Sequence, residues 1–363
     1  MPGSSIGQRL VLTSFGESHG ICVGAVLDGC PAGLELDEKD IQKMLDLRKP
    51  GQSLVSTQRK EEDKVEILSG IFRGYTTGAP IAMIIWNADH DSRAYEQLKT
   101  KMRPGHSDYP ALIKYKKFND FRGGGRFSGR LTATHVMGGA IARKLLKTTL
   151  GIETNSYTLQ IGKIRMSKVT QQMMKMIYSN EVRCPDKNTA KKMRNIILAA
   201  RKKGDSLGGI IESVTTNLPV GLGEPIFGSL ESDLGKALYS IPAVKGIEFG
   251  SGFAGAEAFG SQNNDPYMVK NGKVVTKTNN AGGILGGLSN GMPIVLRIAF
   301  KPASSILKKQ TTIDIKTKKP TSLQVTGRHD PCVVPRAPPV VDSLVSLVLA
   351  DHALQGGFIK PVL

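Results

Sequence analysis

The spacing of apolar and polar positions predicts strands over most of the first 90 residues. Short β-branched or apolar runs there are separated by Gly, Pro and Asp, which interrupt regular structure. We expect strands over residues 9–13, 21–28, 65–72 and 80–86. Later runs of the same kind predict strands over residues 210–216, 245–249 and 293–300.

Helices are predicted where apolar residues recur every three or four positions. Asp37 is the expected N-cap of the first helix, because its acceptor side chain precedes an apolar stripe that starts at Ile41. Further helices are expected over residues 131–146, 167–179, 189–202 and 341–354, and in the segment that carries Leu230, Leu234 and Leu238. The pair Gly138-Gly139 lies inside the helix over 131–146, where glycine costs stability, so we expect another backbone to pack closely there.

The order of these elements favours an α+β fold. Strands and helices are mixed without the regular βαβ alternation of a doubly wound sheet. No repeat, linker or change of composition divides the 363 residues, so we expect one domain over residues 1–363. A chain of this length can bury enough apolar surface to fold without disulfides or a structural metal.

Net charge narrows the class of partner. The chain has 49 Lys and Arg against 31 Asp and Glu, a formal net charge of +18. The excess is concentrated between Lys99 and Lys147, where the only acids are Asp108 and Asp120. Such a surplus indicates an anionic partner, either a nucleic acid or a small phosphorylated molecule. Aromatic residues make up 6% of the chain and do not interleave with the basic ones, which disfavours nucleic acid.

The spacing of the cysteines and the length of the apolar runs indicate where in the cell the protein is located. Cys22, Cys30, Cys184 and Cys332 are far apart and form no CxxC pair. No set of His, Cys and Asp has metal-ligand spacing, so we expect no metal site. The sequence has no secretory leader and no apolar run of membrane-spanning length. These features predict a cytoplasmic protein with free thiols and no membrane partner.

Two histidines lie in glycine-flanked loops. Residues 16–20 read GESHG and place His19 beside a hydroxyl and a carboxylate. Residues 103–106 read RPGH, and the neighbouring cations would oppose protonation of His106, which suits acid–base work near neutral pH. Either loop could instead be a surface connection with a solvated histidine. His90, His135 and His352 lie in a polar loop or in helical patterns, and we expect them to be structural or exposed.

A third loop combines glycine with arginine. Residues 122–130 read RGGGRFSGR and open the predicted helix over 131–146. Three arginines on a flexible loop at a helix N-terminus would gather guanidinium groups and backbone N–H groups around an anion. The alternative is a simple turn, although three crowded cations are costly without an anion. Residues 301–305 (KPASS) and 328–331 (RHDP) carry weaker signals of the same kind, and each could be a turn or a surface ion pair.

Taken together and in this order, the motifs resemble chorismate synthase over nearly the whole chain. The segments that carry the resemblance are residues 16–20 (GESHG), 28–31 (DGCP), 103–108 (RPGHSD), 122–130 (RGGGRFSGR), 280–287 (NAGGILGG) and 328–331 (RHDP). The resemblance implies a lyase of the shikimate pathway that converts 5-enolpyruvylshikimate 3-phosphate to chorismate by trans-1,4-elimination, with reduced FMN and no net redox change. It also implies a homotetramer whose chains have helices sandwiched between antiparallel sheets.

The same resemblance assigns roles to site residues. His19 matches the histidine near the leaving phosphate, His106 matches the one that manages the proton of the reduced flavin, and Asp330 matches the carboxylate that removes the C6 proton. The substrate-binding positions are Ser18, Arg48, Arg103, Arg130 and Arg328. The flavin contacts are Arg126, Phe127, Ser128, Ala243, Gly286, Lys301, Pro302, Ala303, Ser304, Ser305 and Arg328.

The chain departs from the family pattern at a few positions. Leu54 stands where a second phosphate-binding arginine is usual, and Lys49 or Arg59 is the expected substitute. The other departures are Phe127 for Ser, Pro242 for Asn and Asp342 for Glu. Some family members also reduce their own FMN with NADPH, which makes a flavin reductase a second interpretation. No GxGxxG dinucleotide unit supports NADPH binding here.

Overall fold

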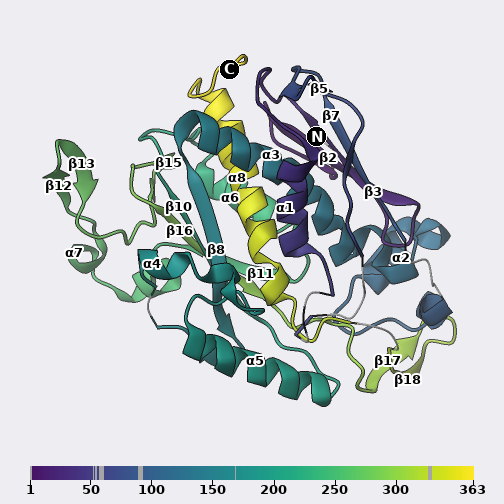
Figure 1. Ribbon diagram of the computed structural model, residues 1–363. Helices are drawn as coiled ribbons and strands as arrows, with labels where there is room; N and C mark the ends of the chain where they lie inside the picture. The colour runs from purple at the N-terminus through teal and green to yellow at the C-terminus, as the bar shows by residue number, and fades with distance from the viewer. Residues whose placement is uncertain are drawn as a thin grey trace.

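Two five-stranded antiparallel sheets enclose a layer of helices in the computed structural model (Figure 1). The structure describes residues 2–51, 53, 55–56, 61–88, 93–167, 169–325 and 329–363. The helix layer consists of α1 (Glu38–Arg48), α3 (Thr132–Leu150), α6 (Leu230–Leu238) and α8 (Pro338–Gln355). This architecture confirms the α+β class and the placement of helices between antiparallel sheets.

The first sheet is formed by the N-terminal part of the chain. Its strands, in spatial order, are β1 (Ser5–Ile6), β2 (Val11–Gly16), β3 (Cys22–Asp28), β7 (Ile81–Trp86) and β4 (Glu66–Ile67). Alternate residues of β3, namely Val23, Ala25 and Leu27, are fully buried on the side of α3. The single strand expected over 65–72 is wrong, because Gly70 turns the chain with a φ of +85° between β4 and β5 (Ile71–Phe72).

The second sheet covers the other side of the helix layer. Its strands are β11 (Val244–Phe249), β16 (Ile294–Phe300), β10 (Gly209–Thr216), β8 (Glu153–Ile161) and β9 (Ile164–Arg165). In β16 the alternate residues Ile294, Leu296, Ile298 and Phe300 are buried. The predictions over 210–216, 245–249 and 293–300 are confirmed to within one residue at each end.

Two adjacent glycines allow the middle of α3 to approach the first sheet and the neighbouring helix α8 closely. A Cβ atom at residue 138 would lie 2.4 Å from Leu12 Cδ1 of the first sheet. A Cβ atom at residue 139 would lie 2.2 Å from Ser343 Cβ on α8. Both distances are too short for a real side chain. The expected close approach of another backbone is confirmed at Gly139, where the neighbour is the Ser343 backbone, whereas Gly138 packs against the Leu12 side chain.

Most of the predicted helices form where the sequence places them. The Asp37 side chain accepts the Asp40 N–H and caps α1, as expected. Outside the sandwich lies α5 (Lys187–Lys202), which matches the prediction over 189–202. The continuous helix expected over 167–179 is wrong: the described residues of this range form α4 (Gln171–Met174) and a 3₁₀ turn, Ile177–Ser179, and no longer helix. The Met176 and Ser179 N–H groups bond three residues back, which tightens the chain out of α-helical geometry.

Short elements surround the two sheets. The remaining helices are α2 (Asp108–Tyr115) and α7 (Gly260–Asn263). β5 pairs with β6 (Tyr75–Thr76), and the other hairpins are β12 (Tyr267–Lys270) with β13 (Lys273–Thr276), β14 (Ile284–Leu285) with β15 (Leu288–Ser289), and β17 (Gln310–Asp314) with β18 (Lys319–Leu323). The 3₁₀ segments are Arg93–Lys99, Lys116–Phe118, Arg122–Phe127, Gly129–Leu131, Ile177–Ser179, Gly252–Glu257 and Val334–Arg336. Among the residues described, no helix has the length and apolar character needed to cross a bilayer.

Candidate active site

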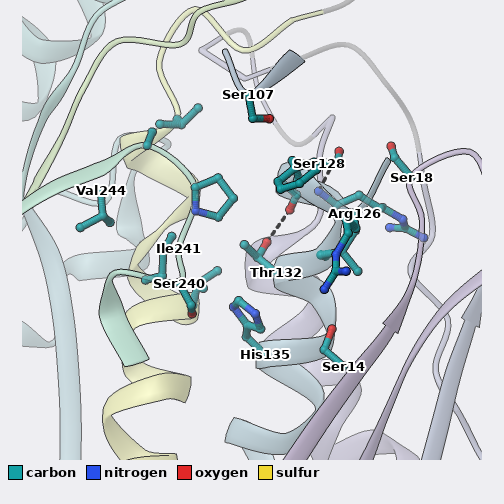
Figure 2. A pocket seen from close by; sticks show the side chains of 18 of the residues that line it. Ser14, Ser18, Ser107, Arg126, Ser128, Thr132, His135, Ser240, Ile241 and Val244 are labelled. Carbon is teal, nitrogen blue, oxygen red and sulfur yellow. Dashed lines mark hydrogen bonds between the residues drawn. The ribbon is translucent and has the colours of Figure 1, made fainter. Parts of the chain in front are cut away.

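A cavity of about 1260 Å³ opens where the ends of both sheets meet the helix layer. Its walls come from the end of β2, the start of β11, the end of β16 and the first turns of α3 and α8. These segments are far apart in sequence, so only the assembled fold creates the cavity. Figure 2 shows part of it, with Ser18 and Arg126 on one side and Ile241 and Val244 on the other.

The walls of the cavity are strongly basic. They include eight cationic side chains and three carboxylates among the described residues. The cations are Arg48, Arg103, Arg126, Arg130, Lys236, Lys245, Lys301 and Arg336, and the carboxylates are Glu17, Glu61 and Asp330. Other basic residues of the 99–147 stretch, such as Lys144 and Lys147, lie outside the cavity wall and pair with Asp40 and Glu153. The positive charge that the sequence indicated is therefore concentrated around a cavity.

The glycine loop over 122–130 brings two of the expected motifs together. Gly123, Gly124 and Gly125 all have positive φ, at +57°, +85° and +51°. A Cβ atom on Gly123 would lie 2.3 Å from His19 Cδ2, and one on Gly124 would lie 3.5 Å from His106 Nε2. The loop thus passes between the GESHG and RPGH segments, and at Gly123 only glycine fits.

Ser18 and His19 occupy different positions relative to the cavity. Ser18 lines it, and its buried hydroxyl has no hydrogen-bond partner among the described residues. His19 is only 6% exposed and packs edge-on against Tyr95, with ring centroids 5.0 Å apart. His19 lies behind the wall formed by Ser18 and Gly123 and is not itself a lining residue.

His106 lies in a cavity wall beside a carboxylate that the sequence reasoning did not consider. Its Nδ1 is 2.6 Å from Asp108 Oδ1 and 3.1 Å from Arg103 Nη2. The expected cation, Arg103, is therefore present beside the ring, but a carboxylate that favours protonation lies there as well. Burial acts to raise the pKa of the Asp108 carboxyl, but hydrogen bonds from Arg103 and His106 outweigh it and hold that pKa well below its usual range. Asp108 is a carboxylate at neutral pH and fixes both side chains.

Two of the expected substrate arginines meet at one buried carboxylate. Arg48 donates through Nη1 to Asp63 Oδ2 at 2.7 Å, and Arg130 donates through its own Nη1 to Asp63 Oδ1. Arg130 Nη1 also lies 2.6 Å from Glu61 Oε2. Arg48 also donates hydrogen bonds to the Thr132 hydroxyl and to the Gly129 carbonyl. The buried Nη2 of Arg130 has no partner within the described part of the chain.

Asp330 lines the cavity and is held by Arg336. Arg336 Nη1 donates to Asp330 Oδ2 at 2.5 Å, and its Nε donates to the Arg48 carbonyl at 3.2 Å. No local pattern in the sequence pointed to Arg336. Arg328 lies outside the described residues, as do Leu54 and Arg59.

Most of the expected flavin-contact residues belong to the walls of the cavity. Arg126, Phe127, Ser128, Ala243, Lys301, Ala303, Ser304 and Ser305 all line it. Lys301 Nζ donates to the Gly105 carbonyl at 3.0 Å and to Ser304 Oγ at 2.9 Å, which ties the KPASS segment to the His106 loop. Burial, with Lys245 nearby, lowers the pKa of Lys301. Pro302 and Gly286 do not line the cavity, and Gly286 lies in the β14–β15 turn.

The remaining residues that the sequence singled out lie at several different places in the structure. Lys49, the suggested substitute for the arginine replaced by Leu54, pairs with Asp46 at 2.8 Å and lines a smaller pocket of about 270 Å³. His352, expected to be structural, is buried and lies 3.0 Å from Asp233. His135, also expected to be structural or exposed, lines the main cavity, and its helical context gave no signal for this. The described residues contain no group of His, Cys, Asp and Glu able to hold a metal ion.

Comparisons with known proteins agree with this geometry. The family model described as chorismate synthase matches residues 10–354. A chorismate synthase of Korarchaeum cryptofilum is 53% identical over 356 residues, covering 98% of each chain, and one of Methanocaldococcus jannaschii is 51% identical over 372 residues, covering 99% of this chain and 98% of the relative. A crystal structure of chorismate synthase superposes with a TM-score of 0.76 at 31% identity, over 96% of this chain and 93% of that one. The chain belongs to the chorismate synthase family, the lyases that form chorismate in the shikimate pathway.

Proposed function

We propose that this cavity converts 5-enolpyruvylshikimate 3-phosphate to chorismate with the help of reduced FMN. The observation that carries the proposal is the placement of Asp330, His106 and the arginines Arg103 and Arg130 around one basic cavity. The substrate carries a phosphate and two carboxylates, and FMN carries another phosphate. Guanidinium forks suit such groups, and a volume of about 1260 Å³ can accept both molecules together.

The arginines would bind the anionic groups of the substrate. Arg130 is the best placed, because its buried Nη2 is still without a partner among the described residues while Asp63 and Glu61 hold Nη1. Arg103 is oriented by Asp108 and also donates to Ser305 at 3.0 Å. Because these guanidiniums are already fixed, little side-chain entropy would be lost when substrate binds.

Other residues of the cavity wall fit a flavin mononucleotide. Lys301, Ser304 and Ser305 offer a cation and two hydroxyls for its phosphate, and Arg126 and Ser128 offer further donors. Apolar side chains such as Ile241 and Val244 suit its flat ring. When bound and reduced, the flavin supplies electron density transiently, so the elimination proceeds without net oxidation or reduction.

The chain's own groups would move the proton and release the phosphate. Asp330, held by Arg336, would take the proton from C6 of the substrate; the electrons of that C–H bond form one new ring double bond, and the double bond already in the ring shifts toward the carbon that carries the phosphate. The phosphate departs with the electrons of its C–O bond toward the wall formed by Ser18 and Gly123, with His19 behind it. His106, oriented by Asp108, would manage the proton of the reduced cofactor.

The proposal includes a single domain, a cytoplasmic location and a homotetramer. One apolar cluster includes side chains from Leu10 to Ile359, which supports one domain. All four cysteines are free, which suits a reducing compartment. Ile226, Phe227, Phe253 and Phe259 are each at least 77% exposed, and large apolar side chains exposed to this degree are typical of subunit interfaces. Sedimentation of the purified protein tests the assembly state.

The activity is tested anaerobically. Protein is mixed with chemically reduced FMN and 5-enolpyruvylshikimate 3-phosphate, and chorismate absorbance and phosphate release are followed together. Equal appearance of both products, dependent on reduced flavin, is expected. A folded protein that binds FMN but forms neither product contradicts the proposal. A parallel reaction with oxidised FMN and NADPH tests whether the chain also reduces its own flavin.

A further inference from the structure

His135 presents an unpartnered imidazole nitrogen to the inner end of the cavity. It lies on α3 one turn beyond Thr132, and Figure 2 shows its ring directed away from α3 into the space beside Ser240 and Ile241. The ring lines the cavity, and its buried Nδ1 has no hydrogen-bond partner among the described residues. A buried polar atom without a partner is costly, so a ligand that supplies one would be favoured.

The surroundings of His135 suit an uncharged polar group. Burial, together with the nearby Arg48 guanidinium, lowers the pKa of His135 to about 4, so the ring is neutral at pH 7. Apolar side chains form much of the wall at this depth: Ile241 faces the ring, and Val340 and Leu344 line the cavity from one face of α8. An anionic group of the substrate would find its counter-charges at the arginines instead.

The isoalloxazine ring of a flavin suits a neutral imidazole that is surrounded by apolar side chains. Its tricyclic system is flat and largely apolar, and its edge carries carbonyl oxygens and ring nitrogens. We propose that His135 is a cofactor-contact residue whose imidazole forms a hydrogen bond with a polar atom on the edge of the isoalloxazine ring. This inference rests on the proposed function, because it needs FMN to occupy the cavity.

Two nearly isosteric variants test the proposal. His135→Asn keeps a polar atom near the position of Nδ1, whereas His135→Leu places only carbon there. We expect the Kd for oxidised FMN, measured by quenching of flavin fluorescence, to be about tenfold higher in His135→Leu than in wild type, the worth of one hydrogen bond. The absorption spectrum and midpoint potential of bound FMN should shift in His135→Leu, and His135→Asn should restore most of each property.

The outcomes separate this inference from the proposed function. Failure of the wild-type protein to bind FMN would overturn both. Normal binding by wild type, with the same Kd, spectrum and potential in His135→Leu, would overturn the role of His135 alone. A rise in substrate KM with unchanged flavin properties would place His135 in the substrate subsite and also refute the proposal. Should His135→Leu fail to fold, His135→Ala makes the same comparison without a steric clash.

Discussion

Arg336 Nη1 donates to Asp330 Oδ2 at 2.5 Å, while Nε of the same guanidinium donates to the backbone carbonyl of Arg48 at 3.2 Å. One side chain therefore links the proposed base to the end of α1. Arg336 is separated from Asp330 by six positions, and Val334–Arg336 forms a 3₁₀ turn that directs the guanidinium back toward the carboxylate. Arg336 is best described as a positioning residue for Asp330.

Removal of Arg336 should slow the reaction more than it weakens substrate binding. A hydrogen bond between charged groups contributes about 1.5–3 kcal/mol, which corresponds to a fall in kcat of roughly 10- to 100-fold in Arg336→Ala. Arg336→Lys should recover only part of the loss, because an ammonium cannot hold Asp330 and the Arg48 carbonyl together. Steady-state kinetics gives kcat and KM separately. Arg165→Ala is the control, because it breaks only an exposed hydrogen bond to Gln160 and lines neither the cavity nor the smaller pocket, so it should keep the wild-type kcat.

His106 and Asp330, the two groups proposed to handle protons, should be needed for the rate of the reaction but not for folding. His106 and Asp330 both line the cavity, so their substitution leaves the apolar core intact. We expect His106→Ala and Asp330→Asn to lose at least about 100-fold in kcat, as is usual for a general acid or base. Thermal unfolding and FMN binding check that each variant is folded. Wild-type turnover in either variant would contradict its assigned role.

Asp63 should be a large determinant of stability. It is fully buried and compensates both Arg48 and Arg130, so Asp63→Asn leaves the buried Arg48 guanidinium without its paired carboxylate and leaves Arg130 paired with Glu61 alone. Breaking such a buried pair costs about 3–5 kcal/mol, which urea unfolding at pH 7 can measure. The control is Glu153→Gln, which breaks a solvent-exposed pair with Lys147 and should cost less than about 1 kcal/mol.

The contribution of Asp63 to the free energy of unfolding should depend on pH. Burial acts to raise the pKa of Asp63, but the Arg48 and Arg130 guanidiniums outweigh it and hold the pKa below its ordinary value. Its contribution to stability is therefore fully present above that ordinary value and is lost as pH falls through the depressed folded-state pKa. The difference in unfolding free energy between wild type and Asp63→Asn should shrink on acidification. A difference that is independent of pH would show that the two arginines do not depend on the charge of Asp63.

Two glycines of the same loop should respond oppositely to alanine. A Cβ atom at residue 123 would lie 2.3 Å from His19 Cδ2, and the φ of Gly123 is +57°, so Gly123→Ala combines a clash with backbone strain. We expect it to lower the Tm by several degrees, since strain and clash together cost about 1–3 kcal/mol. At Gly129 no atom lies within 4 Å of the place that a Cβ would occupy, and φ is not positive. Gly129→Ala should therefore keep or slightly raise the Tm, and equal losses in both variants would rule out this explanation.

Asp342 should make the protein less stable as pH rises. Burial raises the pKa of this carboxyl to about 6, even though Arg143 lies 3.1 Å away and favours the charged form. Between about pH 4 and pH 6 the folded state therefore holds a proton that the unfolded state has released, so the free energy of unfolding falls as pH rises through that range.

Asp342→Asn removes this charge and isolates the effect. Relative to wild type, the variant should gain stability progressively from pH 4 to pH 6, by roughly 3 kcal/mol at most. Urea unfolding at several pH values measures the difference. Asp205→Asn serves as the control: its carboxyl is exposed and paired with Lys308, and its pKa is lowered, so any change should be small and of opposite sign. A flat difference for Asp342→Asn would mean that its carboxyl titrates normally.

The motifs predicted much of the site because the residues of each motif are close in sequence and together suit one kind of ligand. The glycines of 122–130 and the arginines beside them imply a loop around an anion, and the structure places Arg126, Ser128 and Arg130 in the cavity wall. The sequence pattern could not identify Arg336, Asp63 or His135, since each acquires its role from a neighbour distant in sequence. Arg130 and Asp63, for example, are separated by 67 positions and meet only in the folded chain.

Sequence alone determined most of the strands, the N-cap at Asp37 and the family, because alternation, capping side chains and motif spacing are local properties of the chain. Tertiary structure decided which groups face one another. In the folded chain Asp108 lies against His106, and His19 lies behind Gly123 and outside the cavity wall. His135 of α3 lines the cavity. The physical reason is that burial and pairing depend on the packing of whole sheets against whole helices, and a one-dimensional pattern does not contain that packing.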